Sequence, residues 1–206
     1  MVETWVNLSP TSGSGNGTVA VSAKEHTGRN NRTSTITFKS DVAGVTETRE
    51  VIQRGSSEYV KFSKESYSAA ASDIDITLEG ESNSSRLTFV GVKGINISLN
   101  AMYEAAGIKN IQNGFPITGD PGAIEKYNFK IAIPFSKNTD AEDKTYTVKV
   151  TDNAGNTHSV DIKHSAADAF FTVDPESIYP SGSIILESNG MAKPIAISSN
   201  TSWRVF

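Results

Sequence analysis

The sequence predicts an all-β protein made of antiparallel β-sandwiches. Hydrophobic and polar residues alternate with a period of two through much of the chain, as in residues 145–150, and β-branched residues are abundant. Clusters of Gly and Asn, such as residues 13–17 and 152–156, separate these runs and suit the positive φ angles of tight hairpins. The length of 206 residues corresponds to two sandwiches of about 100 residues each.

The composition argues against several kinds of site and partner. The chain has no cysteine, so we expect neither a disulfide framework nor a thiolate site. The formal net charge is -4 and the Lys and Arg residues are not clustered, which argues against a nucleic-acid partner. No apolar run is long enough to cross a bilayer, so we expect no membrane span in this chain.

The two ends of the chain predict the halves of one sandwich in reversed order. Residues 168–206 are expected to form an N-terminal half, with alternating runs at residues 171–175 and 195–205. Residues 1–55 are expected to form a C-terminal half, with a first strand at residues 5–10. Joined tail to head, the two stretches give one uninterrupted pattern. Each half should therefore expose core surface that fits the other.

The middle of the chain, residues 56–167, is predicted to be one complete and diverged repeat of the same plan. Its opening runs, residues 60–63 and 83–89, parallel the tail, and its later run, residues 144–150, parallels residues 32–38 of the head. The chain is therefore expected to hold half a repeat, a whole repeat and half a repeat.

A family resemblance is carried by four parts of the head and tail: Asn200-Thr201-Ser202-Trp203, residues 5–13, the strand that begins at Arg32, and the closing residues 51–53. These parts resemble the BACON domain, a Bacteroidetes-associated carbohydrate-binding module of secreted and surface proteins that also occurs in phage virions. The resemblance implies immunoglobulin-like sandwiches, glycans as partners, and an extracellular or cell-surface location, with a phage virion as the alternative.

Two tryptophans are candidates for stacking on a sugar ring, because an aromatic face packs against one side of a pyranose. Trp5 and Trp203 both lie in alternating, strand-like runs, where a lone Trp is usually buried. We predict that both are core residues.

One segment of the middle repeat, residues 99–127, has no counterpart in the head. Residues 99–106 contain helix-forming residues followed by Gly107, which predicts a short helix. Loops on a rigid sandwich often bind ligands, so this segment is the candidate carbohydrate-binding surface. Its candidate residues are Tyr103, Phe115, Asp120 and Tyr127. In the alternative interpretation, the helix packs its apolar face against one end of the sandwich.

The sequence shows no constellation expected of an enzyme or a metal site. Glycoside hydrolysis needs two carboxylates across a cleft, whereas the carboxylate pairs here lie on polar strand faces. The three histidines are divided between the head and the middle repeat, which argues against a three-ligand zinc site. The acidic run at Asp140, Glu142 and Asp143 fits a charged hairpin better than a calcium loop. We predict no catalytic residues, no metal and no cofactor.

Two function hypotheses remain. The first is a non-catalytic carbohydrate-binding or adhesion module of a cell-surface protein, which follows from the BACON resemblance. The second is a structural protein of stacked or interlocking sandwiches, either a spacer or stalk or a phage virion component. We also expect self-association through the complementary half-domains, by a domain swap or a head-to-tail filament between chains rather than within one chain.

Overall fold

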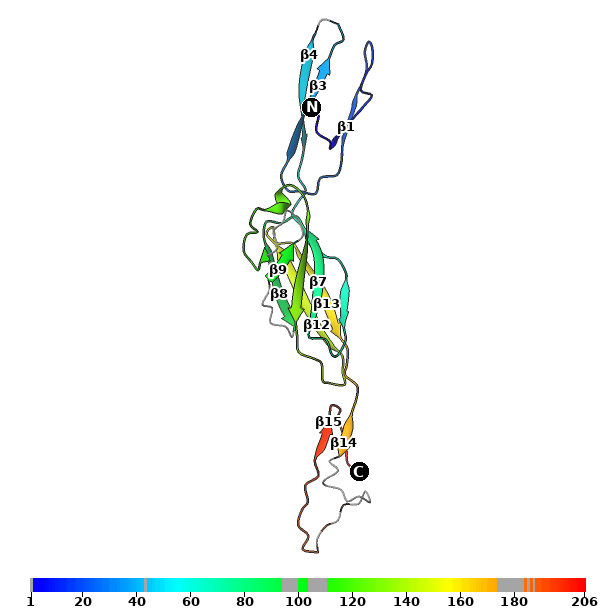
Figure 1. The fold of residues 1–206 in the computed structure, drawn as a ribbon, viewed down its shortest axis with the longest axis vertical. Coiled ribbons are helices and arrows are strands. Elements are labelled where there is room, and N and C mark those ends of the chain that lie inside the picture. Colours follow the sequence, from blue (N-terminus) through cyan, green and yellow to red (C-terminus); the bar gives the residue numbers. More distant parts are fainter. Residues whose placement is uncertain are drawn as a thin grey trace.

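The computed structural model of this protein describes residues 2–42, 44–93, 100–103, 111–173, 184, 186 and 188–206. It is elongated, with two N-terminal hairpins at one end, a β-sandwich in the middle and a C-terminal hairpin at the other end (Figure 1). The regular secondary structure of the described residues is all strand, apart from one 3-10 turn at Pro121–Ala123, η1. This confirms the all-β class. No helix in the described ranges is long and apolar enough to cross a membrane.

The central sandwich contains a five-stranded and a four-stranded sheet. The strand order is β10-β9-β11-β7-β5 in the first sheet and β6-β13-β12-β8 in the second. The strands are β5 (Val60–Phe62), β6 (Ser66–Ala69), β7 (Asp75–Ser82), β8 (Leu87–Lys93), β9 (Asn100–Tyr103), β10 (Ile111–Gln112), β11 (Tyr127–Pro134), β12 (Lys144–Asp152) and β13 (Thr157–His164).

This arrangement is that of an immunoglobulin-like sandwich. When the short strands β6 and β10 are left out, the sandwich has seven strands. The first, second, fifth and fourth of these lie side by side in one sheet, in the order β5-β7-β11-β9. The third, sixth and seventh form the other sheet, in the order β8-β12-β13. Neighbouring strands are antiparallel, except that β6 runs parallel to β13. The structure therefore confirms the immunoglobulin-like antiparallel fold for the middle of the chain.

The core of the sandwich follows from the alternation in its strands. On β11, the inward positions Phe129, Ile131 and Ile133 are buried and the positions between them are more exposed. The ring of Phe129 meets those of Phe62 and Phe89 edge to face, at centroid distances of 6.0 and 5.5 Å. All buried members of this cluster lie between residues 60 and 162, so the sandwich has a core of its own.

The head consists of two antiparallel hairpins with a small core. They pair β1 (Val6–Ser9) with β2 (Ala20–Ala23), and β3 (Arg32–Lys39) with β4 (Thr46–Gln53). Trp5 packs with Val6 and Ile36, and the Arg32 guanidinium lies 4.6 Å from the centre of its ring. The prediction that Trp5 is a core residue is confirmed.

The tail forms a single hairpin, in which β14 (Phe171–Val173) pairs with β15 (Ile197–Ser199). Most of its described apolar side chains are exposed, and Trp203 is 51% exposed. The prediction that Trp203 is a core residue is wrong in this structure, because two short strands provide no opposing sheet against which the ring can pack.

The predicted helix over residues 99–106 is also wrong where the structure describes it. Residues 100–103 form β9, which places Tyr103 opposite Phe129 and Met102 opposite Lys130 on β11. Helix propensity is a weak preference, and pairing with the edge of an existing sheet overrides it. Residues 99 and 104–106 lie outside the described residues.

The central sandwich generates a first prediction. Because both large sheets and their buried cluster are built from residues 60–164, a fragment of residues 56–167 is expected to fold alone. Its thermal unfolding, followed by circular dichroism, should be cooperative. A fragment that remains unfolded while the whole chain folds would contradict this.

Candidate functional site

The four predicted carbohydrate-binding residues do not form one exposed surface. The backbone of Tyr103 lies in β9, and Phe115 lies in a loop with 57% of its surface exposed. Tyr127 is buried, and its hydroxyl donates a hydrogen bond to the Ser84 carbonyl at 2.8 Å. Burial raises the pKa of the Tyr127 phenol. Phe115 is thus a ring that a ligand can reach, whereas Tyr127 is part of the core.

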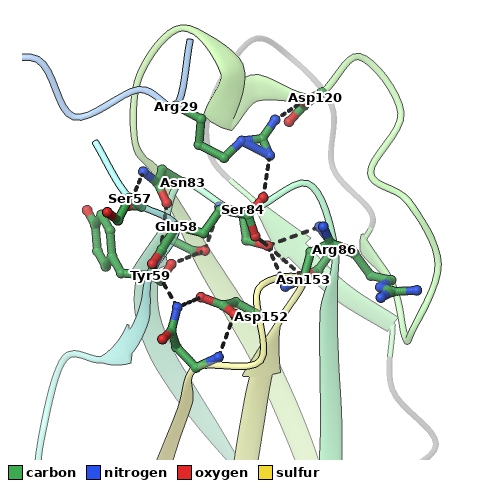
Figure 2. A network of polar contacts seen from close by, with 12 residues as sticks. Arg29, Ser57, Glu58, Tyr59, Asn83, Ser84, Arg86, Asp120, Asp152 and Asn153 are labelled. Carbon is green, nitrogen blue, oxygen red and sulfur yellow. Dashed lines mark hydrogen bonds and ion pairs between the residues drawn. The ribbon is translucent and has the colours of Figure 1, made fainter. Parts of the chain in front are cut away.

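Asp120 lies in a polar cluster at the end of the sandwich that faces the head (Figure 2). Its carboxylate pairs with the guanidinium of Arg29, which also donates to Glu58 Oε1 at 3.0 Å. Arg29 belongs to the head, Glu58 to the linker before β5, and Asp120 to the loop before η1. We call this cluster the first junction, since it joins the head to the central sandwich.

The centre of the first junction is Asn83, in the turn that follows β7. Its side chain is fully buried and uses both ends of the amide. The Oδ1 atom accepts the backbone N–H of Tyr59 at 2.9 Å. The Nδ2 group donates to the carbonyls of Ser57 at 3.0 Å and of Thr27 at 2.9 Å. One side chain therefore ties the head, the linker and the sandwich together.

Two serines beside Asn83 complete this turn. Ser82 donates its hydroxyl to the Tyr59 carbonyl at 2.6 Å and accepts the backbone N–H of Ser84 at 2.9 Å. Ser84 Oγ donates to Glu58 at 3.0 Å and accepts the backbone N–H of Asn153 at 2.9 Å. Ser82 and Ser84 are fully buried, so the hydroxyls offset the cost of removing these groups from water.

The same arrangement recurs where the sandwich meets the tail. There Asn200 Oδ1 accepts the backbone N–H of Phe170 at 2.9 Å. Its Nδ2 group donates to the carbonyls of Asp168 at 2.9 Å and of Thr139 at 3.1 Å. Asn200 thus reproduces the three bonds of Asn83, with Thr139 taking the place of Thr27. We call this the second junction.

The serine bonds recur as well. Ser199 donates to the Phe170 carbonyl at 3.1 Å and accepts the backbone N–H of Thr201 at 3.0 Å. These two bonds match those that Ser82 makes in the first junction.

The linkers add two matched pairs of bonds. The backbone N–H of Ser56 donates to the backbone carbonyl of Gly28 at 2.8 Å. In the same way, the backbone N–H of Ala167 donates to the backbone carbonyl of Asp140 at 2.8 Å. The N–H of Gly55 donates to Asn31 Oδ1 at 3.0 Å, as that of Ala166 does to Asp143 Oδ1 at 2.8 Å. The two ends of the sandwich are therefore joined to their neighbours by one repeated set of bonds.

The first junction has one additional element, the loop at residues 117–126. Its carbonyls accept the backbone N–H groups of the head, from Arg29 to Gly122 at 2.9 Å and from Asn30 to Ala123 at 3.0 Å. A Cβ atom on Gly28 would collide with the backbone of Ile124. The loop proposed from the sequence as a ligand surface therefore packs against the head in this region.

A group of charges lies beside the first junction. Glu81 pairs with Lys126 at 2.9 Å and with Lys61 at 3.0 Å. Burial alone would raise the pKa of the Glu81 carboxyl, but the two ammonium groups together lower it below its ordinary value. Burial and the negative charge of Glu81 raise the pKa of the Tyr59 phenol to about 12. Glu81 is therefore ionised near neutral pH.

The described residues contain no group of three His, Asp or Glu side chains that could hold a metal ion. The acidic run instead forms ion pairs, from Asp140 to Lys144 at 2.9 Å and from Asp143 to Lys163 at 2.7 Å. It connects β11 to β12, which belong to different sheets, so the prediction that this charged run forms a hairpin is wrong.

A comparison with known protein families finds a match in the head. Residues 2–54 match the family model of BACON, described as "Putative binding domain, N-terminal". This match confirms the resemblance to BACON in this part of the chain. A search of curated proteins finds no match.

Two solved structures show weak similarity. A family 123 glycoside hydrolase from Clostridium perfringens is 13% identical, with a TM-score of 0.31, over 50% of this chain and 23% of that one. An endo-fucoidan hydrolase from glycoside hydrolase family 107 is 16% identical, with a TM-score of 0.27, over 81% of this chain and 26% of that one. The matches therefore span about a quarter of each solved chain.

The sequence contains a signal for the junctions. Asn83 and Asn200 each follow a serine at the end of a strand, and Thr27 and Thr139 hold matching places before the Arg32 and Lys144 strands. When the repeats are aligned by these spacings, Asn83 is matched with Asn200 and Thr27 is matched with Thr139. This alignment needs only the sequence.

The buried amide of Asn83 generates a second prediction. Asn83→Ala leaves an N–H and two carbonyl groups without their partner, and each buried group left unpaired costs about 1–3 kcal/mol. We expect the free energy of unfolding to fall by at least about 2 kcal/mol in urea titrations. Asn128→Ala, on the exposed side of β11, is the matched control. Equal stabilities of the two variants would refute the role of Asn83.

The ion pairs of Glu81 generate a third prediction. Because the folded pKa of Glu81 is lowered, its stabilising effect is complete above the ordinary value of 4.5 and disappears as pH falls through the lowered pKa. Glu81→Gln should destabilise the protein near neutral pH and have progressively less effect in acid. Glu65→Gln, at an exposed position, is the control and should change the stability little near neutral pH. A Glu81→Gln effect that is independent of pH would argue against this electrostatic account.

Proposed function

We propose that this protein is a non-catalytic spacer in which immunoglobulin-like sandwiches are held end to end by a repeated junction. The observation that carries this proposal is the recurrence of the Asn83 bonds at Asn200. A junction that recurs with the same donors and acceptors gives consecutive units a reproducible connection. A stalk or a fibrous surface structure needs such a connection.

The first junction is built to resist bending. Its polar groups are largely buried, so bending would break hydrogen bonds that water cannot easily replace. Arg29 of the head adds ion pairs to Glu58 in the linker and to Asp120 in the sandwich. The carbonyls of the loop at residues 117–126 bind the head directly. Together these contacts favour one orientation of the head.

A second candidate function is carbohydrate binding, which the match of residues 2–54 to the BACON family supports. The exposed ring of Phe115 is the best placed of the four predicted residues for stacking on a sugar. We propose that any glycan site is non-catalytic and lies outside the junctions, because the side-chain amides at their centres, Asn83 and Asn200, are already hydrogen-bonded within the chain.

The spacer function generates a fourth prediction, on the rigidity of the first junction. A double variant with Thr37→Cys in the head and Asn128→Cys in the sandwich can carry one spin label on each cysteine. No other residue would be labelled, because the natural chain has no cysteine. Pulsed electron paramagnetic resonance should give one narrow distribution of the distance between the two labels. Asn83→Ala should broaden this distribution. Asn16→Ala, in an exposed loop, is the control. A distance distribution that is already broad when Asn83 is present would overturn the spacer proposal.

A glycan array separates the two candidate functions. Binding to a defined glycan that is lost in Phe115→Ala, and retained in the exposed-surface control Val42→Ala, would support carbohydrate binding. An absence of binding across host and plant polysaccharides would favour the spacer without a ligand of its own.

A further inference from the structure

Strand β7 of the central sandwich has an open edge over part of its length. On one side it pairs with β11 throughout, from Asp75 to Ser82. On the other side β5 pairs only with residues 80–82, and no other described strand joins this edge. After β5 the chain leaves this sheet and continues in β6, which belongs to the opposite sheet. The edge of β7 from Asp75 to Glu79 therefore lacks a neighbouring strand.

The direction of the backbone groups on this edge follows from the hydrogen bonds at Glu79. The Tyr67 hydroxyl accepts the Glu79 N–H at 3.1 Å and donates to the Glu79 carbonyl at 3.2 Å, on the side away from β11. Backbone groups alternate in direction along an antiparallel strand, so those of Thr77 and Asp75 also point away from β11. Pro134, which lies opposite Asp75 on β11, fits this assignment because proline has no N–H to donate.

Strand β6 has a second open edge across from that of β7. The carbonyl of Ala69 accepts the backbone N–H of Ser165 at 2.9 Å, in the parallel pairing of β6 with β13. By the same alternation, Ser66 and Ser68 direct their backbone groups away from β13. A hollow of about 590 Å³ lies here, lined by Lys64 and by residues of β6 and β7. The hollow therefore has a strand edge along each wall.

Apolar surface is exposed where β5 ends. Ile76 is half-buried and lines the hollow, and Ile74, immediately before β7, is 59% exposed. Leu78, the next inward residue after Ile76, is fully buried. A strand added to the open edge would bury apolar area that the sandwich leaves in solvent, which is favourable.

The outer face of the same edge is acidic. Asp75 and Glu79 lie two residues on either side of Thr77, and all three are exposed. Glu79 pairs with Lys130 at 3.4 Å on the β11 side. A residue of an added strand that lay opposite Thr77 would have both carboxylates as diagonal neighbours. This charge favours a basic side chain at that position.

We propose that the open edge of β7 binds an extended, basic peptide segment of a partner protein as an added antiparallel strand. The peptide residue opposite Thr77 exchanges both backbone hydrogen bonds with it. Its basic side chain lies outward between Asp75 and Glu79, and its apolar neighbours lie inward against Ile76. This interaction goes beyond the spacer function, because it gives the spacer a place at which another protein is held.

Fluorescence anisotropy of a labelled peptide added to the full chain tests the proposal. The probe is a short peptide with blocked ends in which Lys and Val alternate, and its binding should saturate below about 1 mM. Thr77→Pro should weaken binding at least about tenfold, because it removes an N–H group from the open edge and no hydrogen bond to β11. Thr77→Ala keeps this N–H and is the matched control, which should bind as the natural chain does.

Modified peptides provide a second comparison that does not depend on the folding of Thr77→Pro. Methylation of the backbone nitrogens of the Lys residues should abolish binding, since these N–H groups face β7. Methylation of the Val nitrogens, whose N–H groups point away from β7, should leave binding intact. A peptide in which Glu replaces Lys should bind the natural chain more weakly, and Asp75→Lys should reduce this preference.

Three results would overturn the proposal. The first is an absence of saturable binding to the natural chain, and the second is an equal effect of methylation at Lys and at Val. The third is dimerisation of the chain alone that Thr77→Pro prevents, because the occupant of the edge would then be a second copy. Residues 75–79 lie outside both junctions, so none of these results bears on the spin-label test of the spacer proposal.

Discussion

The side-chain amides of Asn83 and Asn200 are the contacts on which the arrangement of this chain depends. Each amide accepts a backbone N–H group of a linker and donates to a backbone carbonyl of the same linker. It also donates to a backbone carbonyl of the preceding unit. An amide can make these bonds because it carries both donors and an acceptor in one plane. A hydrophobic contact at the same place would hold the units together without fixing their orientation, since it has no direction.

This constraint explains why the chain is elongated (Figure 1). The junctions place the units in line, and the central sandwich has a complete core of its own. The head has only a small cluster around Trp5 and Ile36, and the tail leaves Trp203 in solvent. Most of the exposed large apolar side chains therefore lie in the head and the tail.

The fold class could be predicted from the sequence, because it depends on local patterns. Period-two alternation marks β11 and β12, and it also places Tyr127 on the same inward face as Phe129 and Ile131, which indicates burial rather than ligand binding. The Asn83 site was harder to predict, since its partners come from segments far apart in the chain. The strand at residues 100–103 could not be predicted from propensity, because its form is set by pairing with β11.

The central claim is that the first junction, with Asn83 at its centre, holds the head and the central sandwich in one orientation. Hydrogen exchange of the backbone amides tests it most directly, because the bonds of this junction occupy particular N–H groups. The account predicts that the amides of Tyr59, Arg29 and Asn30, which donate hydrogen bonds at this junction, exchange slowly, and that Asn83→Ala speeds their exchange while the amides of β11 stay protected. Rapid exchange of these three amides in the unsubstituted protein would contradict the account.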